Sequence, residues 1–454
     1  MRKSIKKIYK PLLTLAGAAV ISVLAAGTVI SFVGFDGGDY TVPELDLSVK
    51  PEGIGAQYDY LYELVTVDDS ADYLAHPDSV LLKNGNILTM YPKGHGKGAV
   101  LNKVSTDGGK SWSGKIENTP ASWENSLETP TVYRLKFTDG VTGDKLIMIS
   151  ANPKWPGMDT NGGFNCSVSS DEGENWTEFE CFYDKDSENT VIPIVAMASL
   201  TQLKENGRFV DKWMGFFHDA DFYNYKTILT FDGDGNPHWS VPEKYFSDYR
   251  ETEKKAKMCE VEVIRSEGGQ GDELCLISRS NSKKMNSLVS FSSDEGKTWS
   301  EPKEVPAALN GERHKAEWTA DGRLFITFRS IERGKKARET VGFRFFGTKH
   351  WSSEGWVAWV GSYDDLKNGT EGQYRIKLAH IYKNGQTEPC DDANADTGYC
   401  GNVVLDDGVI VTSTYGNFSP DSKTSDGELR TYICSKRINL PDTDELVKNY
   451  LNDK

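Results

Sequence analysis

The stretch Ser292-Ser-Asp-Glu-Gly-Lys-Thr-Trp299 and its relatives elsewhere in the chain decide the fold. Two further copies are Ser105-Thr-Asp-Gly-Gly-Lys-Ser-Trp112 and Ser169-Ser-Asp-Glu-Gly-Glu-Asn-Trp176, and an altered copy is Thr230-Phe-Asp-Gly-Asp-Gly-Asn-Pro-His-Trp239. The four copies start at residues 105, 169, 230 and 292, so the chain repeats about every 62 residues. Self-similarity at a fixed period indicates a repeat architecture.

Each copy has the chemistry of a rigid turn between two antiparallel strands. The Asp side chain accepts hydrogen bonds from the amides of its own turn, and the Gly adopts a φ that a side chain would forbid. The Ser caps the turn and the Trp folds back over it. Runs such as Lys145-Leu-Ile-Met-Ile-Ser150 lie between the copies and have strand composition. One repeat therefore holds about four strands, which is the size of a propeller blade.

Division of the repeat region by this period predicts an all-β, six-bladed (alternatively five-bladed) β-propeller over residues 56–440. The fifth blade is degenerate around Trp351 to Tyr363, and the sixth around Tyr399 to Tyr432. Residues 36–55 are rich in Gly and Pro and are predicted to form a stalk or linker. Residues 441–454 are predicted to form a short polar helical tail.

The first 35 residues have the pattern of an export signal. Five cations precede an uncharged, apolar stretch over residues 12–35. A basic start followed by an apolar segment is typical of a secretory signal, and 24 residues are long enough to span a bilayer. We predict that residues 1–35 are a signal peptide or a membrane anchor, and that the protein is secreted or anchored to the cell membrane, outside the cytoplasm.

Charge and cysteine usage exclude several kinds of partner. The net charge is −15, and the exported part is more acidic still because the leader holds five cations. Such a surface repels phosphate backbones, so we expect no nucleic-acid partner. The seven cysteines form no CxxC pair, which argues against a zinc cluster. We expect a monomer that needs no cofactor.

In a propeller, polar residues at the start of each inner strand gather on one face of the axis. We therefore searched each repeat for charged or aromatic residues just before its inner strand. The candidates from these positions and the adjoining loops are His76, Asp78, His95, Glu128, His218, Asp219, Glu260, Arg279, Arg313, His314, Arg329, Asp396 and Tyr399.

Over about residues 60 to 435, the chain resembles the sialidase (neuraminidase) superfamily, whose repeated turns are called Asp-boxes or BNR repeats. Cys259-Glu260-Val-Glu-Val-Ile264, followed by Ile277-Ser-Arg279, is similar to the sialidase blade that carries a Glu and a substrate-binding Arg. Gly398-Tyr399 resembles the late blade whose Tyr is the nucleophile. The resemblance implies a glycosidase that acts on terminal sugars, in which Glu260 deprotonates Tyr399 and the phenolate attacks the anomeric carbon.

The sequence also departs from the sialidase pattern. The first blade begins with His76-Pro-Asp78 where the family has Arg-Ile-Pro, and the following loop presents His95 where the family has its acid/base Asp. We therefore expect Asp78 or His95 to act as the acid. Of the three-arginine carboxylate clamp, Arg279 remains, with Arg329 or Arg344 as further candidates. The expected outcome is altered sugar specificity, with His76, Glu128, His218, Asp219 and His314 as further substrate-binding candidates.

Two alternatives follow from the same residues. Imidazole and carboxylate groups suit a divalent metal with an open position for water, so a metal-dependent carbohydrate hydrolase or deacetylase would use His76, His95 and His218. A non-catalytic glycan-binding propeller would instead stack sugar rings on tryptophans. Its candidates are Trp123, Trp155, Trp351 and Trp356.

Overall fold

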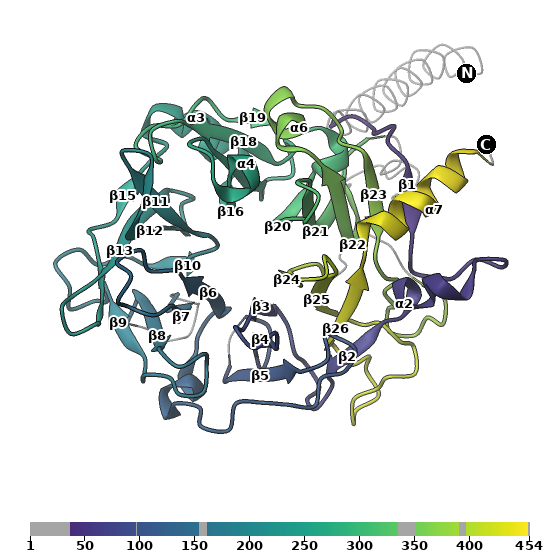
Figure 1. Cartoon of the computed structure of the whole chain (residues 1–454), viewed down its shortest axis with the longest axis horizontal. Coiled ribbons are helices and arrows are strands. Elements are labelled where there is room, and N and C mark those ends of the chain that lie inside the picture. Colours follow the sequence, from purple (N-terminus) through teal and green to yellow (C-terminus); the bar gives the residue numbers. More distant parts are fainter. Residues whose placement is uncertain (1–36, 97, 154–160, 335–350, 390–395, 453–454) are drawn as a thin grey trace, which may run out of the picture.

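The computed structural model describes residues 37–96, 98–153, 161–334, 351–389 and 396–452 of the chain. Within them, six small sheets surround a common axis (Figure 1). The prediction of an all-β, six-bladed propeller is confirmed, and the five-bladed alternative is wrong. The predicted leader over residues 1–35 lies outside the described residues.

Each blade runs from an inner strand at the axis to an outer strand at the rim. The inner strands are β3 (Asp78–Leu81), β6 (Thr131–Leu135), β10 (Pro193–Val195), β16 (Met258–Arg265), β20 (Gly311–Trp318) and β24 (Gly401–Val404). The second strands are β4 (Ile87–Pro92), β7 (Lys145–Ala151), β12 (Arg208–Asp219), β17 (Leu274–Ser280), β21 (Leu324–Glu332) and β25 (Ile410–Gly416). The third strands are β5 (Val100–Ser105), β8 (Phe164–Ser169), β13 (Asn224–Phe231), β18 (Leu288–Ser292), β22 (Ser352–Gly361) and β26 (Tyr432–Ile438).

Blades two to six add outer strands. These are β9 (Glu180–Phe182), β14 (Pro237–Trp239), β19 (Lys303–Glu304), β23 (Tyr374–Lys377) and β2 (Val65–Asp68). In the third blade, β11 (Leu200–Glu205) and β15 (Glu243–Lys244) also pair with β12 and β13. Because β2 comes from the N-terminal side and pairs with β26 of the last blade, the two ends of the ring are joined by a sheet.

Helices are short and lie between or outside the strands. They are η1 (Ala56–Tyr58), α2 (Asp59–Tyr62), η2 (Ala121–Asn125), η3 (Ser247–Tyr249), α3 (Arg250–Ala256), α4 (Ser266–Gly269), η4 (Ala307–Leu309), α6 (Tyr363–Asn368) and α7 (Leu440–Asn452). In the part of the chain that the structure covers, none of these helices has the length and apolarity needed to cross a membrane.

Both segments that flank the repeats pack on the propeller. Within the predicted stalk, β1 (Glu44–Asp46) pairs in parallel with β23 as an extra strand of the fifth blade, and Leu47 is fully buried. The predicted polar tail is helix α7, which buries Leu446 and Val447 in the same core cluster (Figure 1). Within the predicted stalk or linker over residues 36–55, residues 44–47 therefore pack against the fifth blade.

The repeated turns have the predicted hydrogen bonds. In the fourth blade, Ser292 donates its hydroxyl to Asp294 at 2.8 Å, and Asp294 also accepts from the Thr298 amide at 2.9 Å. Gly296 has a φ of +71°, which favours glycine. Trp299 is 7% exposed and covers the turn. The first and second blades repeat this pattern around Asp107 and Asp171.

Bulges shape the inner strands where they approach the axis. The pairing register shifts between Cys259 and Glu262 in β16, and between Glu312 and Lys315 in β20. Such bulges re-aim a side chain, often beside an active site. Several residues close to the ends of inner strands or within them have a left-handed φ, including His76 (+47°), Met197 (+51°), Glu260 (+47°) and Arg313 (+55°).

Candidate active site

Glu260 and Tyr399 meet near the axis although 139 positions separate them in the chain. Glu260 lies on β16, and Tyr399 comes just before β24. The Tyr399 hydroxyl is 2.8 Å from Glu260 Oε1 and 2.9 Å from Oε2, and both residues are buried. Arg279 on β17 donates through Nη1 to Glu260 Oε2 at 2.7 Å and to the Tyr399 hydroxyl. The structure thus brings the predicted pair and the predicted arginine together.

A second buried carboxylate, Glu312 on β20, holds three cations. Its Oε1 lies 2.7 Å from Lys283 Nζ and 3.1 Å from Arg279 Nη2, and its Oε2 lies 3.0 Å from Arg329 Nη1. The Glu312 side chain is 3% exposed. Because buried charges must be paired, Glu312 fixes the two arginines in place.

The remaining donors of Arg329 are also occupied. Nε donates to the Thr397 carbonyl at 2.6 Å, and Nη2 donates to the Tyr415 hydroxyl at 2.8 Å and to Asp396 Oδ1 at 3.3 Å. The Tyr415 hydroxyl donates to the same Asp396 oxygen at 2.8 Å. Arg329 therefore links the loop before β24 to β25.

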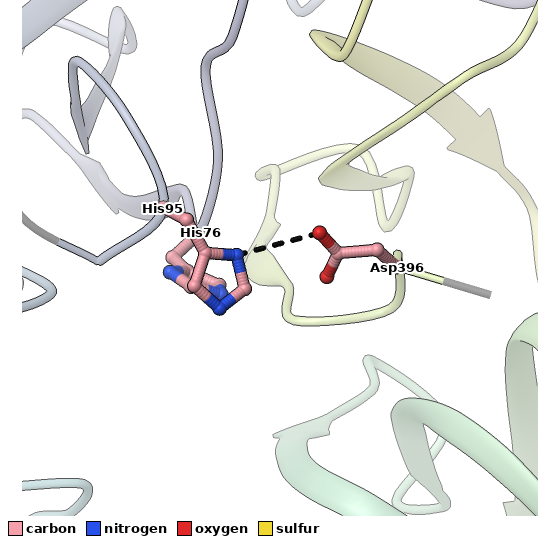
Figure 2. A group of neighbouring side chains, drawn as sticks. All are labelled: His76, His95 and Asp396. Atoms are coloured by element: carbon pink, nitrogen blue, oxygen red, sulfur yellow. Dashed lines mark ion pairs between the residues drawn. The ribbon is translucent and has the colours of Figure 1, made fainter. Parts of the chain in front are cut away.

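His95 and Asp396 form an ion pair at the edge of this network (Figure 2). His95 Nδ1 lies 3.3 Å from Asp396 Oδ2 and 2.8 Å from the Tyr73 hydroxyl, which also donates to Asp396. The His95 side chain is 63% exposed, so it can reach a ligand. The predicted histidine thus has a carboxylate partner that orients it.

His76 packs between the ion pair and the nucleophile candidate. Its ring centroid lies 4.8 Å from those of His95 and Tyr399. His76 Nδ1 lies 3.1 Å from the Thr129 hydroxyl oxygen, and Thr129 donates that hydroxyl to Glu128 at 2.8 Å. The predicted residues His76 and Glu128 are therefore joined through Thr129 beside the site.

Burial and nearby charges shift the pKa values of Glu260 and Tyr399 in opposite directions. Burial alone would raise the pKa of Glu260, but Arg279 and Arg313 outweigh it and lower the pKa to about 2. Burial raises the pKa of Tyr399 well above its ordinary value; Glu260 adds to this rise and Arg279 opposes it. At neutral pH, the resting pair is a carboxylate and a protonated phenol.

The pKa values of His95 and Glu128 are raised, whereas the pKa of His76 is lowered. The hydrogen bond to Asp396 raises the pKa of His95 above its ordinary value. Burial lowers the pKa of His76 to about 3, so its ring is neutral. Burial also raises the pKa of Glu128, against hydrogen bonds from Thr129 that lower it.

Four predicted residues have other surroundings. Asp78 lies 3.2 Å from Lys315 and accepts from the Val132 amide, away from the Glu260–Tyr399 pair. Asp219 accepts hydrogen bonds from amides of its own loop. His314 is buried, and its Nε2 lies 2.9 Å from the Leu309 carbonyl oxygen.

The fourth, His218, is buried and stacks on Phe222, with its ring centroid 5.9 Å away. Burial lowers the pKa of His218 to about 4, although the nearby Glu260 raises it. It therefore lies near the central carboxylate as a neutral ring.

The structure also places most of the tryptophans of the glycan-binding alternative. Trp123 and Trp356 are 1% and 0% exposed, so their rings are core residues that cannot stack on a sugar. Trp351 is partly exposed, with Lys283 Nζ 4.6 Å from its ring centroid. Trp155 lies outside the described residues.

One group of side chains in the described part of the chain could hold a metal ion. One ligand atom each from His76, His95 and Asp396 lies within 4.8 Å of the others (Figure 2). His218, the third ligand of the metal alternative, does not belong to this group. Arg329 Nη2, 3.3 Å from Asp396, adds a positive charge that opposes a cation there.

Sequence reasoning left several site residues out of its candidates. They are Tyr73, Lys283, Glu312 and Tyr415. Glu312 directly precedes the candidates Arg313 and His314, and the pairing register of β20 shifts between Glu312 and Lys315. The one available signal was a run of three charged or polar residues, Glu312-Arg-His314, at the start of an apolar strand.

Comparisons with known proteins agree on the fold. No protein-family model matches the chain, and no curated protein matches it. A protein of unknown function from Dyadobacter fermentans is 16% identical and has a TM-score of 0.52 over 83% of this chain and 97% of that chain. An α-L-arabinanase from Penicillium chrysogenum, solved with arabinobiose, is 14% identical and has a TM-score of 0.52 over 83% of this chain and 98% of that chain.

An intramolecular trans-sialidase from Ruminococcus gnavus also matches, at 11% identity and a TM-score of 0.48, over 84% of this chain and 97% of that chain. The propeller fold predicted from the repeat is thus one that this chain shares with solved structures. Carbohydrate-cleaving enzymes are among the proteins that share it.

Proposed function

We propose that this protein is an exported glycoside hydrolase that removes terminal sugars from a glycan. One observation carries the proposal: the Tyr399 hydroxyl donates to both oxygens of Glu260 while Arg279 donates to both groups. A general base must lie within hydrogen-bond reach of the proton that it removes, and this pair meets that condition. The fold shared with an arabinanase supports a carbohydrate substrate.

In the first chemical step, the Tyr399 oxygen bonds to the anomeric carbon as the phenol proton passes to Glu260. The glycosidic bond breaks, and its electron pair leaves with the departing oxygen. Because the resting pair strongly favours the neutral phenol, proton transfer and attack occur together, when the anomeric carbon is most electrophilic. Arg279 stabilises the charge that develops on the phenol oxygen.

The departing oxygen needs a proton, and His95 supplies it. Its pKa is raised by Asp396, which favours the protonated ring, and its side chain is accessible. After departure, the neutral ring removes a proton from water. That water attacks the anomeric carbon, releases the sugar and restores Tyr399 with the proton held on Glu260.

The site supports altered specificity rather than the ordinary sialic acid clamp. Arg279 and Arg329 already donate to Glu260, Glu312 and Asp396. His76, with its neutral ring, stands where the family has its first arginine. A substrate carboxylate would have to displace protein carboxylates in order to reach this pair.

The test measures aryl-alcohol release from a panel of aryl glycosides, including sialosides, uronides and arabinofuranosides. We expect release of one sugar class by the wild type and a loss of about 10²- to 10⁴-fold in kcat for Tyr399→Phe. Tyr62→Phe removes the same hydroxyl group from helix α2, outside the ring of blades (Figure 1), and is the matched control that should keep the wild-type kcat. Full activity of Tyr399→Phe would refute the assignment.

A metal-dependent hydrolase is the second candidate, because His76, His95 and Asp396 form a group of possible ligands. In that case, EDTA abolishes sugar or acetate release and a divalent cation restores it, while Tyr399→Phe stays active. Glycan binding without any turnover would instead support the non-catalytic propeller. Export follows from the leader over residues 1–35, and cleavage of that leader is tested by N-terminal sequencing of the mature protein.

A further inference from the structure

Arg313 differs from every other cation of the site in having no partner. Its Nη1 atom is buried and has no hydrogen-bond partner among the described residues. Within the same part of the chain, no carboxylate lies within salt-bridge distance of Arg313, whereas Arg279, Lys283 and Arg329 all have one. A buried guanidinium without a partner is costly. It therefore calls for a functional explanation.

The backbone conformation at Arg313 is also strained. Arg313 has a φ of +55° at the bulge of β20, in a region that residues with side chains rarely adopt. Glu260, Tyr133 and Asp78, from three other blades, are the charged or titratable groups that act on it most strongly. Strained residues of this kind cluster where ligands bind.

The charges around Tyr399 leave Arg313 in excess. Among the described residues, Arg279, Lys283 and Arg329, together with His95 when its ring is protonated, share three carboxylates: Glu260, Glu312 and Asp396. Arg313 is a further cation; the residue as a whole is partly exposed, and its Nη1 atom is buried.

Two further carboxyl groups, Asp78 and Glu262, do not neutralise the charge of Arg313. Asp78 already lies 3.2 Å from Lys315. Burial raises the pKa of Glu262 to about 7, so that carboxyl is only partly ionised at neutral pH. Among the described residues, the cations of the site therefore outnumber its ionised carboxylates.

A groove beside the site has the same sign of charge. It has a volume of about 470 Å³ and is lined by four lysines and one glutamate: Lys254, Lys255, Lys257, Lys284 and Glu251. Asn281 also lines the groove and accepts a hydrogen bond from Arg279 Nη2 at 2.8 Å, so the groove borders the catalytic residues. In a chain with a net charge of −15, a local excess of lysines beside the site favours an anionic ligand.

We propose that Arg313 binds an oxyanion on the terminal sugar, a carboxylate or a sulfate ester, and that the substrate is an acidic glycan. This inference rests on the proposed function for the role of the site. It adds the class of substrate and the residue that recognises it. Arg279 and Arg329 hold protein carboxylates, whereas Arg313 offers free donors in the fork geometry that matches an oxyanion.

The test is calorimetric titration of the protein with three sets of probes: carboxylated sugars (N-acetylneuraminate, glucuronate and galacturonate), sugar sulfates, and neutral hexoses and arabinose. The wild type should bind one acidic set, which identifies the oxyanion, and should not bind the neutral set. Arg313→Met should lose about 10- to 100-fold in affinity for that probe. Arg208→Met, at an exposed position far along β12, is the matched control and should bind like the wild type.

Thermal unfolding without ligand separates binding from structure. Because Arg313→Met removes an unpaired buried charge, its Tm should equal or exceed that of the wild type. A lower Tm with unchanged binding of the acidic probe would overturn the proposal, as would a wild type that binds neutral probes only. Binding of the acidic probe that survives in Tyr399→Phe, without turnover in the wild type, would sink the proposed function and leave the role of Arg313 intact. Hydrolysis of neutral glycosides with unchanged KM in Arg313→Met would do the reverse.

Discussion

The rim and the axis of this propeller are built by opposite rules. At the rim, the hydrogen bonds of each Asp-box turn are local. Asp294 accepts from Ser292 and Thr298 within one turn, and the first and second blades repeat the arrangement. At the axis, the polar contacts run between blades and do not repeat. Glu260, Glu312 and Tyr399 come from three different blades and meet only because the ring closes.

The difference separates what holds the fold from what can act on a ligand. An Asp-box turn at the rim satisfies its own polar groups, so the effect of disrupting one turn stays within its blade. The axial charges satisfy one another across blades, so the loss of one leaves several unpaired. Substitutions at the two places should therefore differ in kind as well as in size.

The largest effect should follow from Glu260→Gln. The amide cannot accept the phenol proton of Tyr399, so we expect kcat on the best aryl glycoside to fall about 10²- to 10⁴-fold. Glu301→Gln, an exposed residue at the rim, should leave kcat unchanged. Steady-state kinetics of both variants would measure the contrast, and comparable activity in the two would place the chemistry elsewhere.

Glu312→Gln should destabilise the fold more than any rim substitution of similar size. The change leaves Arg279, Lys283 and Arg329 short of a counter-charge, and breaking such a buried pair costs about 3–5 kcal/mol. Denaturant unfolding of the variant and of Glu301→Gln would measure the difference. Equal free energies of unfolding would mean that the cations find other partners.

The same carboxylate gives a pH signature. Burial alone would raise the pKa of Glu312, but Arg279, Arg329 and Lys283 lower it to about 2. A depressed pKa stabilises the folded state above the ordinary glutamate pKa of about 4.3, and the contribution is lost as pH falls through the folded value. The gap in stability between wild type and Glu312→Gln should therefore be full at neutral pH and shrink between about pH 4 and pH 2.

At the rim, Asp294→Ala should have a smaller effect, confined to stability. It removes the acceptor of the Ser292 and Thr298 hydrogen bonds in one turn, which we expect to cost about 1–3 kcal/mol. Asp232→Ala, in the altered and exposed copy, should cost less because no serine caps that turn. Both variants should keep the wild-type kcat when folded, and a lower kcat in either would break the separation between rim and axis.

The smallest expected effect is a shift in pH dependence. Asp396 raises the pKa of His95, so the acid form of His95 persists toward higher pH. In Asp396→Asn, this support is lost and the alkaline limb of kcat/KM should move to lower pH. An unchanged limb would show that another group, such as Glu128, supplies the proton.

The sequence was informative about the rim because the Asp-box motif repeats at a constant period, and a repeat of about 62 residues predicts a propeller blade. It was informative about Glu260, Arg279 and Tyr399 because those residues resemble the sialidase blades. It could not predict Glu312, since two of its partners, Arg279 and Lys283, come from the neighbouring blade and no spacing links them to it. It named Arg313 and His314 together, and the structure separates them: His314 is buried beside the Leu309 carbonyl, whereas the charge of Arg313 acts on Glu260.

The central claim is that Tyr399 attacks the sugar. The most direct measurement is intact-protein and peptide mass spectrometry after incubation with a fluorinated aryl glycoside of the sugar that the panel identifies, because fluorine slows release of a covalent intermediate. We predict one sugar per chain, on the peptide that contains Tyr399, and no adduct in Tyr399→Phe. An adduct on Glu260 would contradict the account, and so would turnover that is abolished by EDTA with no adduct on any residue.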